Sequence, residues 1–180
     1  MSRSKRALSA PARNEAYLAF GSNLGEREGH LRAALAELRL RAGAEIFAVS
    51  SLYATEPVGL AGPAPRFLNA VAGLRTALSP EALLDACLAI EAAHGRLRPS
   101  NGRPASRTLD IDLLDYAGTV RSTPRLVLPH PRLTERAFVL LPLAEIAPNL
   151  RISGKTAAEW ASRADAAGVT RLSRRSTAAW

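Results

Sequence analysis

Hydrophobic residues alternate with polar ones in some stretches of the chain and recur every three to four residues in others, which distinguishes strands from helices. Residues 16–20 form a short apolar run that predicts a buried strand, and the glycine-containing stretch 21–25 predicts the turn after it. A leucine stripe with helical spacing follows, and Gly43 predicts the end of that helix. The stripe consists of Leu31, Leu35 and Leu38.

The next part of the chain predicts two strands separated by a loop. Residues 45–55 are rich in β-forming side chains, whereas residues 56–66 are rich in proline and glycine. Residues 67–76 alternate as a strand does, so that successive side chains point to opposite faces. One face would carry Phe67, Asn69 and Val71, and the other Leu68, Ala70, Ala72 and Leu74.

A second helix is predicted to begin after Ser79, which is a suitable N-cap and is followed by Pro80 in the first turn. Gly95 predicts its end. The buried stripe of this helix would consist of Leu83, Cys87 and Ile90. A polar stretch, residues 96–107, then leads into a predicted strand at 108–116.

The last third of the chain predicts a short hairpin through Gly118, a strand at 126–128 and a helix at 135–146. Pro142 is expected to kink or end that helix, and residues 148–180 are expected to form a helical appendage and a frayed end. The order strand–helix–strand–strand–helix–strand predicts an α+β, ferredoxin-like sandwich, an antiparallel sheet with helices packed on one face.

With 180 residues, of which 47% are hydrophobic, the chain can build one core. We expect a disordered extension at 1–14, a single domain at 15–165 and a tail at 166–180. No apolar run approaches the roughly 18–20 residues that a membrane span needs. A single cysteine, Cys87, excludes an internal disulfide and favours a reducing, cytoplasmic location.

The net charge of +8 indicates an anionic partner, and both nucleic acid and nucleotide phosphate qualify. Aromatic residues make up 5% of the chain, and no basic stretch interleaves them as a platform for stacking bases would. Charge alone therefore does not choose between these partners.

The strongest candidate for chemistry is an acidic pair on the predicted strand 108–116. Asp110 and Asp112 are two residues apart, so both project from one face of the strand, roughly 7 Å apart along the chain. Two adjacent carboxylates suit Mg²⁺, which commonly binds one or two carboxylates together with substrate phosphates. An exposed strand face with acids for solubility is the alternative.

Arginines precede the acidic pair without an acid among them: Arg96, Arg98, Arg103 and Arg107. Carboxylates that hold Mg²⁺ beside guanidinium groups that hold phosphate would suit phosphoryl transfer. The stretch is long enough to form a lid, and a solvated surface loop is the alternative. The turn at 21–25 could meet an anion but lacks the spacing of a P-loop, and His130 by itself is more typical of a structural role.

These segments resemble, in order, the 6-hydroxymethyl-7,8-dihydropterin pyrophosphokinase family of folate biosynthesis. The resemblance runs from Tyr17 to Pro148 and is most specific in RTLDIDLLDY and LVLPHPRL. The other segments are AYLAFGSNLGER, SSLYATEPVG, RFLNAV, IEAAHGRLR and ERAFVLLPLAEIAP. It implies a Mg²⁺-dependent enzyme that transfers pyrophosphate from ATP to the pterin alcohol and releases AMP.

The resemblance also implies residue roles. Asp110 and Asp112 match the aspartates that bind two Mg²⁺ ions, and with Arg96 and Arg107 they form the expected catalytic set. The expected ATP-binding residues are Glu91, Arg96, Arg98, Arg107, Arg125, His130 and Arg136. The expected pterin-binding residues are Thr55, Val58, Phe67, Asn69 and Phe138. Many members carry Trp-Gly-Pro before the acidic segment, where this chain has Pro104-Ala105-Ser106, so the lid contact to the pterin differs.

We therefore expect ATP and the hydroxymethyl pterin as partners of a monomer that binds neither nucleic acid nor membrane. Two other functions are compatible with parts of the pattern. A nucleotidyltransferase could use the same acidic pair and would release pyrophosphate instead of AMP. An RNA-binding module would use the basic charge and an aromatic sheet face, and the sequence contains no such aromatic motif.

Overall fold

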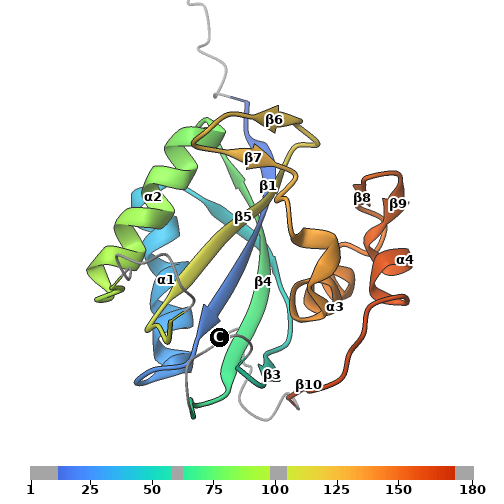
Figure 1. The fold of residues 1–180 in the computed structure, drawn as a ribbon. Helices are drawn as coiled ribbons and strands as arrows, with labels where there is room; N and C mark the ends of the chain where they lie inside the picture. The colour runs from blue at the N-terminus through green and yellow to red at the C-terminus, as the bar shows by residue number, and fades with distance from the viewer. Residues whose placement is uncertain (1–11, 58–62, 98–104, 173–180) are drawn as a thin grey trace, which may run out of the picture.

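The computed structural model describes residues 12–57, 63–97 and 105–172, and these residues form a six-stranded antiparallel sheet with helices on both faces (Figure 1). The strand order is β10-β3-β4-β1-β5, and β2 pairs with β4 beside β3. The strands are β1 (Asn14–Ser22), β2 (Glu45–Val49), β3 (Tyr53–Thr55), β4 (Phe67–Thr76), β5 (Asp110–Tyr116) and β10 (Val169–Arg171).

Two helices, α1 (Arg27–Arg41) and α2 (Pro80–Ala93), cover one face of the sheet, and α3 (Ala137–Ile146) packs on the opposite face (Figure 1). The predicted α+β sandwich is therefore confirmed, with a helix on the second face that the prediction of a one-sided arrangement did not include. Each helix buries an apolar stripe because the sheet removes that stripe from water. The second core, around α3, lies directly beside the site described below.

The alternation predicted for β4 is confirmed, since its two faces enter two different cores. Leu68 and Leu74 pack with α1 and α2, whereas Val71 packs with α3. Asn69 lies on the same face as Val71 and is 5% exposed. A strand buried on both faces thus presents one polar side chain at the end where the site forms.

The predicted strand at 45–55 is wrong in one respect, because it is two strands that break at Ser50. The Ser50 backbone N–H donates to Val71 O at 2.9 Å, and its hydroxyl accepts from Val71 N at 3.0 Å. The Ser51 backbone N–H donates to the Glu145 carboxylate at 3.1 Å instead of to a neighbouring strand. Side-chain partners for these backbone groups permit the break.

The region after β5 also differs from the prediction. Gly118 lies in the turn that follows β5, but the hairpin is formed further on, between β6 (Arg121–Ser122) and β7 (Val127–Leu128). A 3₁₀ turn, η1 (Leu133–Glu135), precedes α3. Pro142 does not end α3, which continues to Ile146.

The C-terminal residues form a small appendage that returns to the main sheet. A hairpin leads to α4, which begins with a capping box in which Thr156 and Glu159 bond reciprocally. The appendage consists of β8 (Arg151–Ile152), β9 (Lys155–Thr156) and α4 (Ala157–Ala161). Residues 169–171, assigned to the tail by sequence, pair with β3 as strand β10. In the described ranges, no helix has the length and apolar character needed to cross a bilayer.

Candidate active site

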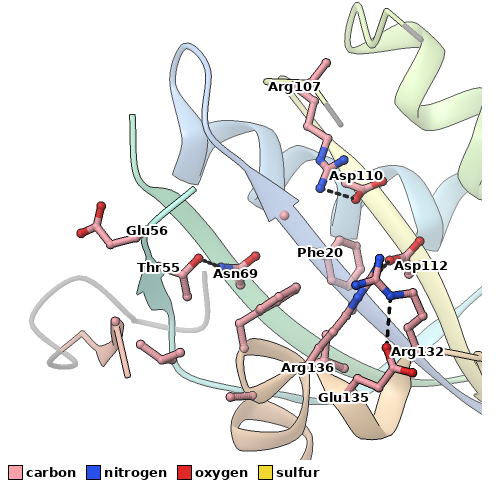
Figure 2. Close-up of a pocket in the computed structure, with 18 of the residues that line it drawn as sticks. Phe20, Thr55, Glu56, Asn69, Arg107, Asp110, Asp112, Arg132, Glu135 and Arg136 are labelled. Carbon is pink, nitrogen blue, oxygen red and sulfur yellow. Dashed lines mark hydrogen bonds and ion pairs between the residues drawn. The ribbon is translucent and has the colours of Figure 1, made fainter. Parts of the chain in front are cut away.

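A cavity of about 710 Å³ opens where β1, β4 and β5 meet α3 and residues 165–169 (Figure 2). Asp110 and Asp112 line it from β5, Thr55 and Asn69 line it from β3 and β4, and Phe138 lines it from α3. Elements that are distant in sequence therefore converge on one space of the size that a small-molecule site requires.

The two aspartates lie on the same face of β5, as predicted. Asp110 stands opposite Gly21 and Asp112 opposite Ala19 on β1, so small residues flank both carboxylates. A Cβ atom on Gly21 would lie 3.3 Å from the side-chain oxygen of Asn69, which is tighter than nearly all such contacts. Glycine therefore keeps the space between the acidic pair and Asn69 open.

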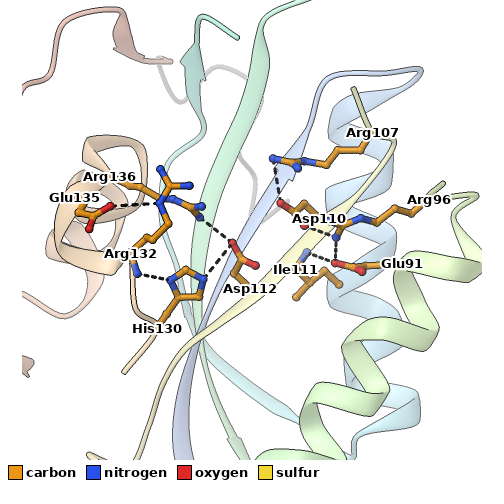
Figure 3. Close-up of polar contacts among 10 residues, drawn as sticks. All are labelled: Glu91, Arg96, Arg107, Asp110, Ile111, Asp112, His130, Arg132, Glu135 and Arg136. Carbon is orange, nitrogen blue, oxygen red and sulfur yellow. Dashed lines mark hydrogen bonds and ion pairs between the residues drawn. The ribbon is translucent and has the colours of Figure 1, made fainter. Parts of the chain in front are cut away.

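Guanidinium groups surround Asp110 (Figure 3). Arg96 forms ion pairs with both Asp110 and Glu91, and Arg107 Nη2 lies 3.2 Å from Asp110 Oδ2. Glu91 is 2% exposed and accepts a hydrogen bond from the Ile111 backbone N–H at 2.8 Å, which attaches the end of α2 to β5. Arg96 is thus held by two carboxylates at the rim of the cavity, where it can meet a phosphate.

Two basic side chains, Arg136 and His130, face Asp112. Arg136 Nη1 lies 3.2 Å from Asp112 Oδ2, and His130 Nε2 lies 4.0 Å from the same oxygen (Figure 3). Burial, and then the charge of Asp110, raises the pKa of Asp112, while the facing cations oppose this shift. Burial lowers the pKa of His130, and Asp112 opposes that change. Asp112 therefore pays a desolvation cost that a bound cation would offset.

The family resemblance implies Mg²⁺, and the residues present fit it. Two carboxylates project into one cavity, one of them with a pKa raised by burial and by the other carboxylate. Across the described ranges, no group of three or more His, Cys, Asp or Glu side chains is arranged for a metal. Such a two-carboxylate set suits an ion that completes its shell with phosphate and water oxygens rather than a closed zinc-type cage.

The opposite side of the cavity, which we call the neutral half, is lined mainly by uncharged side chains. Its two carboxylates have partners: Glu56 pairs with Arg66, and Asp165 accepts from Ala167 N. The Asn69 amide donates to Thr55 Oγ1 at 2.9 Å, which fixes the orientation of the amide toward the cavity. The guanidinium carbon of Arg136 lies 5.8 Å from the Phe138 ring centre, and that of Arg107 lies 5.2 Å from the Phe67 ring centre. Phe138 lines the cavity, whereas Phe67, which the sequence placed in the pterin pocket, is buried and does not line it. An amide and an aromatic ring beside the acidic pair suit a flat, polar-edged ring.

The remaining predicted residues fall at the edges of this arrangement. Arg125 is paired with Asp85, and together with Glu91 and His130 it lines a smaller hollow of about 280 Å³ on the other side of Asp110 and Asp112. Arg98 and Val58 lie outside the described residues.

Sequence reasoning missed one side chain that organises the site. Asn23 is 1% exposed; its side-chain oxygen accepts from Arg107 N at 2.7 Å, and its amide donates to Ser106 Oγ at 2.9 Å and to Pro65 O at 3.3 Å. It therefore joins the turn after β1 to the segments that precede β4 and β5. The conformation of the turn at 21–25 therefore depends on the Asn23 amide as well as on the glycines. The local spacing of residues does not indicate the long-range partners of Asn23.

Known proteins resemble this chain over most of its length. The model of the 7,8-dihydro-6-hydroxymethylpterin-pyrophosphokinase family matches residues 17–148. The chain is 45% identical over 157 residues to the 2-amino-4-hydroxy-6-hydroxymethyldihydropteridine pyrophosphokinase of Methylorubrum extorquens, covering 87% of this chain and 98% of the relative. It is also 45% identical over 133 residues to the Bacillus subtilis protein of the same name, covering 74% of this chain and 78% of that one.

Solved structures share the fold at low sequence identity. An HPPK-DHPS crystal structure in complex with substrates superposes with a TM-score of 0.66 and 16% identity, over 84% of this chain and 43% of that longer chain. Wild-type Plasmodium falciparum HPPK-DHPS also gives a TM-score of 0.66, with 13% identity, over 86% of this chain and 45% of that one. These likenesses confirm the predicted ferredoxin-like fold. The family match over most of the chain decides the assignment: the chain belongs to the 7,8-dihydro-6-hydroxymethylpterin-pyrophosphokinase family.

Proposed function

We propose that this chain transfers the pyrophosphoryl group of ATP to the hydroxymethyl group of 6-hydroxymethyl-7,8-dihydropterin, in folate biosynthesis. The observation that carries the proposal is the division of one cavity into two halves. One half holds Asp110 and Asp112 among arginines, and the other holds the Asn69 amide beside Phe138. A triphosphate needs cations around it, whereas a flat heterocycle needs an aromatic ring and a group that can bond its polar edge. This cavity has these two kinds of surface side by side.

The anionic half would bind ATP. Arg96, Arg107 and Arg136 each lie against one of the two aspartates, so their guanidinium groups converge on the same space. Phosphate oxygens accept paired hydrogen bonds from guanidinium groups, which places the reacting phosphorus and offsets the charge that it carries. His130, with a pKa lowered by burial, would reach the phosphates as a neutral hydrogen-bond donor.

The neutral half would bind the pterin. The Asn69 amide, oriented by Thr55, would read the polar edge of the ring, and Phe138 would contact its face. The hydroxymethyl oxygen would then attack the β-phosphorus of ATP, and the bond from that phosphorus to the oxygen of AMP would break. Placing two substrates in this order can lower the barrier by roughly 7–11 kcal/mol, so orientation is the main contribution of the protein.

Asp110 and Asp112 would hold two Mg²⁺ ions. Bound there, Mg²⁺ offsets negative charge on the triphosphate and aligns it. Arg96 lies against Asp110 and Arg136 against Asp112, so each carboxylate has a guanidinium partner beside the proposed metal site. The finer assignments that accompany the proposal are two ions per site, a monomer, and a cytoplasmic enzyme whose single thiol, Cys87, is buried.

Product analysis tests the proposal. Purified protein is incubated with ATP, Mg²⁺ and the hydroxymethyl pterin, and the products are separated by ion-exchange chromatography. We expect AMP and the pterin diphosphate in equal amounts. Release of pyrophosphate would favour a nucleotidyltransferase, which could use the same acidic pair. Failure to form AMP with Mg²⁺ and both substrates present would overturn the proposal.

A further inference from the structure

Part of the cavity wall comes from a segment outside the stretch that matches the family. The match ends at Pro148, yet Asp165, Ala167, Gly168 and Val169 line the same cavity as Thr55 and Asn69. We call residues 165–171 the C-terminal wall. It lies beside the neutral half of the cavity.

Backbone pairing attaches the wall to β3. Val169 lies opposite Thr55, and Arg171 opposite Tyr53, in an antiparallel ladder. The Leu172 backbone N–H adds a bond to Leu52 O at 2.8 Å. Since the Thr55 hydroxyl accepts the Asn69 amide bond, the wall lies one strand away from the side chain expected to read the substrate edge.

Arg66 connects the wall to β3 through its side chain, and we call this set of contacts the clamp. Its guanidinium forms an ion pair with Glu56 at 2.8 Å, and it donates to Ala54 O at 3.4 Å. The same group donates to two atoms of the wall, Gly168 O at 3.5 Å and Thr170 Oγ1 at 3.4 Å. One side chain therefore connects β3, the residue after it and the C-terminal wall, immediately before β4 begins.

The far end of the wall is anchored to the helix that carries Phe138. Arg171 Nη2 lies 2.9 Å from Glu145 Oε1 on α3 and 3.0 Å from Ser51 Oγ. Tyr53 Oη donates to the other Glu145 oxygen at 2.9 Å. Burial and the Glu145 hydrogen bond raise the pKa of Tyr53 to about 12, so this phenol remains a donor at neutral pH.

A tight turn presents short side chains to the cavity. The Ala167 N–H donates to Asp165 Oδ1 at 2.9 Å, and the Val169 N–H donates to Ala166 O at 3.0 Å. Gly168 has φ +74°, a conformation that favours glycine. Small apolar groups at a cavity wall admit a flat ring while displacing water from its edge.

We propose that the C-terminal wall is a specificity-determining surface for the pterin, and that Arg66 is the positioning residue that holds it. The wall limits the width of the neutral half and keeps β3, with Thr55, in register with Asn69. Its polar contacts among the described residues are with β3, Arg66, Ser51 and α3, so we expect it to act on the pterin and not on ATP. This inference rests on the proposed function.

Two variants act on the wall by different routes. Arg66→Met removes the clamp but keeps the length of the side chain, and Ala167→Leu adds bulk at the cavity wall. We expect each to raise the KM for the pterin roughly 5- to 10-fold, with kcat and the KM for ATP within twofold of wild type. Arg66→Lys keeps the charge beside Glu56 and should give an intermediate KM. Arg151→Met is the matched control, because Arg151 lies on β8 in the appendage and donates to Gly154 O within its own hairpin.

Steady-state kinetics with each substrate varied, together with thermal unfolding, decides the matter. Pterin KM values at the wild-type level in both variants would overturn the inference, as would equal losses for ATP and pterin. If Arg66→Met unfolds, Ala167→Leu still decides, because it breaks no bond of the clamp. Absence of turnover in the wild-type protein is a different result, since it would remove the proposed function itself.

Discussion

The two halves of the cavity are built by different means. The anionic half takes its two carboxylates and one of its arginines, Arg107, from a six-residue stretch that leads into β5 and forms its start. The neutral half takes Thr55, Asn69 and Phe138 from three elements that the chain reaches at widely separated points. Charge is thus concentrated locally in sequence, whereas the neutral surface exists only after the sheet has formed.

Because the two halves are built differently, substitutions in them should have different effects on catalysis and on substrate binding. Charges in the anionic half compensate one another, so removal of one group leaves a buried partner unpaired and changes the chemistry of the site. Groups in the neutral half contribute single hydrogen bonds and ring contacts, so their removal should weaken the binding of one substrate.

The largest effect should come from the acidic pair. Asp110→Ala or Asp112→Ala should lower kcat by at least about 100-fold with Mg²⁺ present, because metal-ion charge stabilisation is worth several kcal/mol. Glu45→Ala, which removes an exposed carboxylate on β2, is the control and should leave kcat unchanged. Retention of more than about a tenth of the wild-type kcat in both aspartate variants would reject the metal role.

Arg96 should come next. Arg96→Ala removes the cation shared by Asp110 and Glu91 and should lower kcat about 10- to 100-fold, while the pterin KM changes little. Steady-state assays in which each substrate is varied in turn separate kcat from the pterin KM. Arg32→Ala, on the exposed side of α1, is the control. A change confined to the affinity for the pterin would contradict the assignment of Arg96 to the anionic half.

A smaller effect is expected in the neutral half. Asn69→Leu removes the amide that donates to Thr55 and should raise the pterin KM about 10-fold, as expected for one buried hydrogen bond to substrate. The ATP KM should stay within about twofold. Asn14→Leu, which removes an amide bonded to Tyr116 at the far end of β1, is the control. Equal losses for both substrates would show that the halves are not separate.

The smallest effect concerns a carboxylate without a cation. Asp115, on β5 with the acidic pair, is 1% exposed, and within the described part of the chain its Oδ1 has no hydrogen-bond partner. Burial raises its pKa above the ordinary value of 3.8, although the Gly118 N–H opposes the shift. The folded state therefore holds this proton more tightly than the unfolded state, and ionisation costs stability as pH rises.

Asp115→Asn should thus stabilise the protein by about 1 kcal/mol at pH 7, since the buried charge is removed. The gain should shrink as the pH is lowered through the raised folded-state pKa and should vanish below the ordinary value of 3.8, where the wild-type group is protonated in both states. Urea unfolding at several pH values measures this. A gain that is constant with pH would assign the effect to packing and not to charge.

Local sequence determined much of the frame. The alternation of residues 67–76 predicted β4 and the face on which Asn69 lies, because side-chain direction in a strand depends only on parity. The Ser79 cap predicted the start of α2 for an equally local reason, and the Ser79 hydroxyl accepts from Ala82 N. The same parity argument placed Asp110 and Asp112 on one face.

Tertiary structure alone decided how these pieces meet. The pairing of β10 with β3, the contact of Arg136 with Asp112, and the bridge from Asn23 to Ser106 join residues far apart in the chain. Such contacts follow no local period, because the partner is chosen by the shape of the whole sheet and by which buried polar groups need a bond. The sequence by itself therefore determined the strands, the helices and the acidic pair, while the folded chain decided which cations face the acids and which segment closes the cavity.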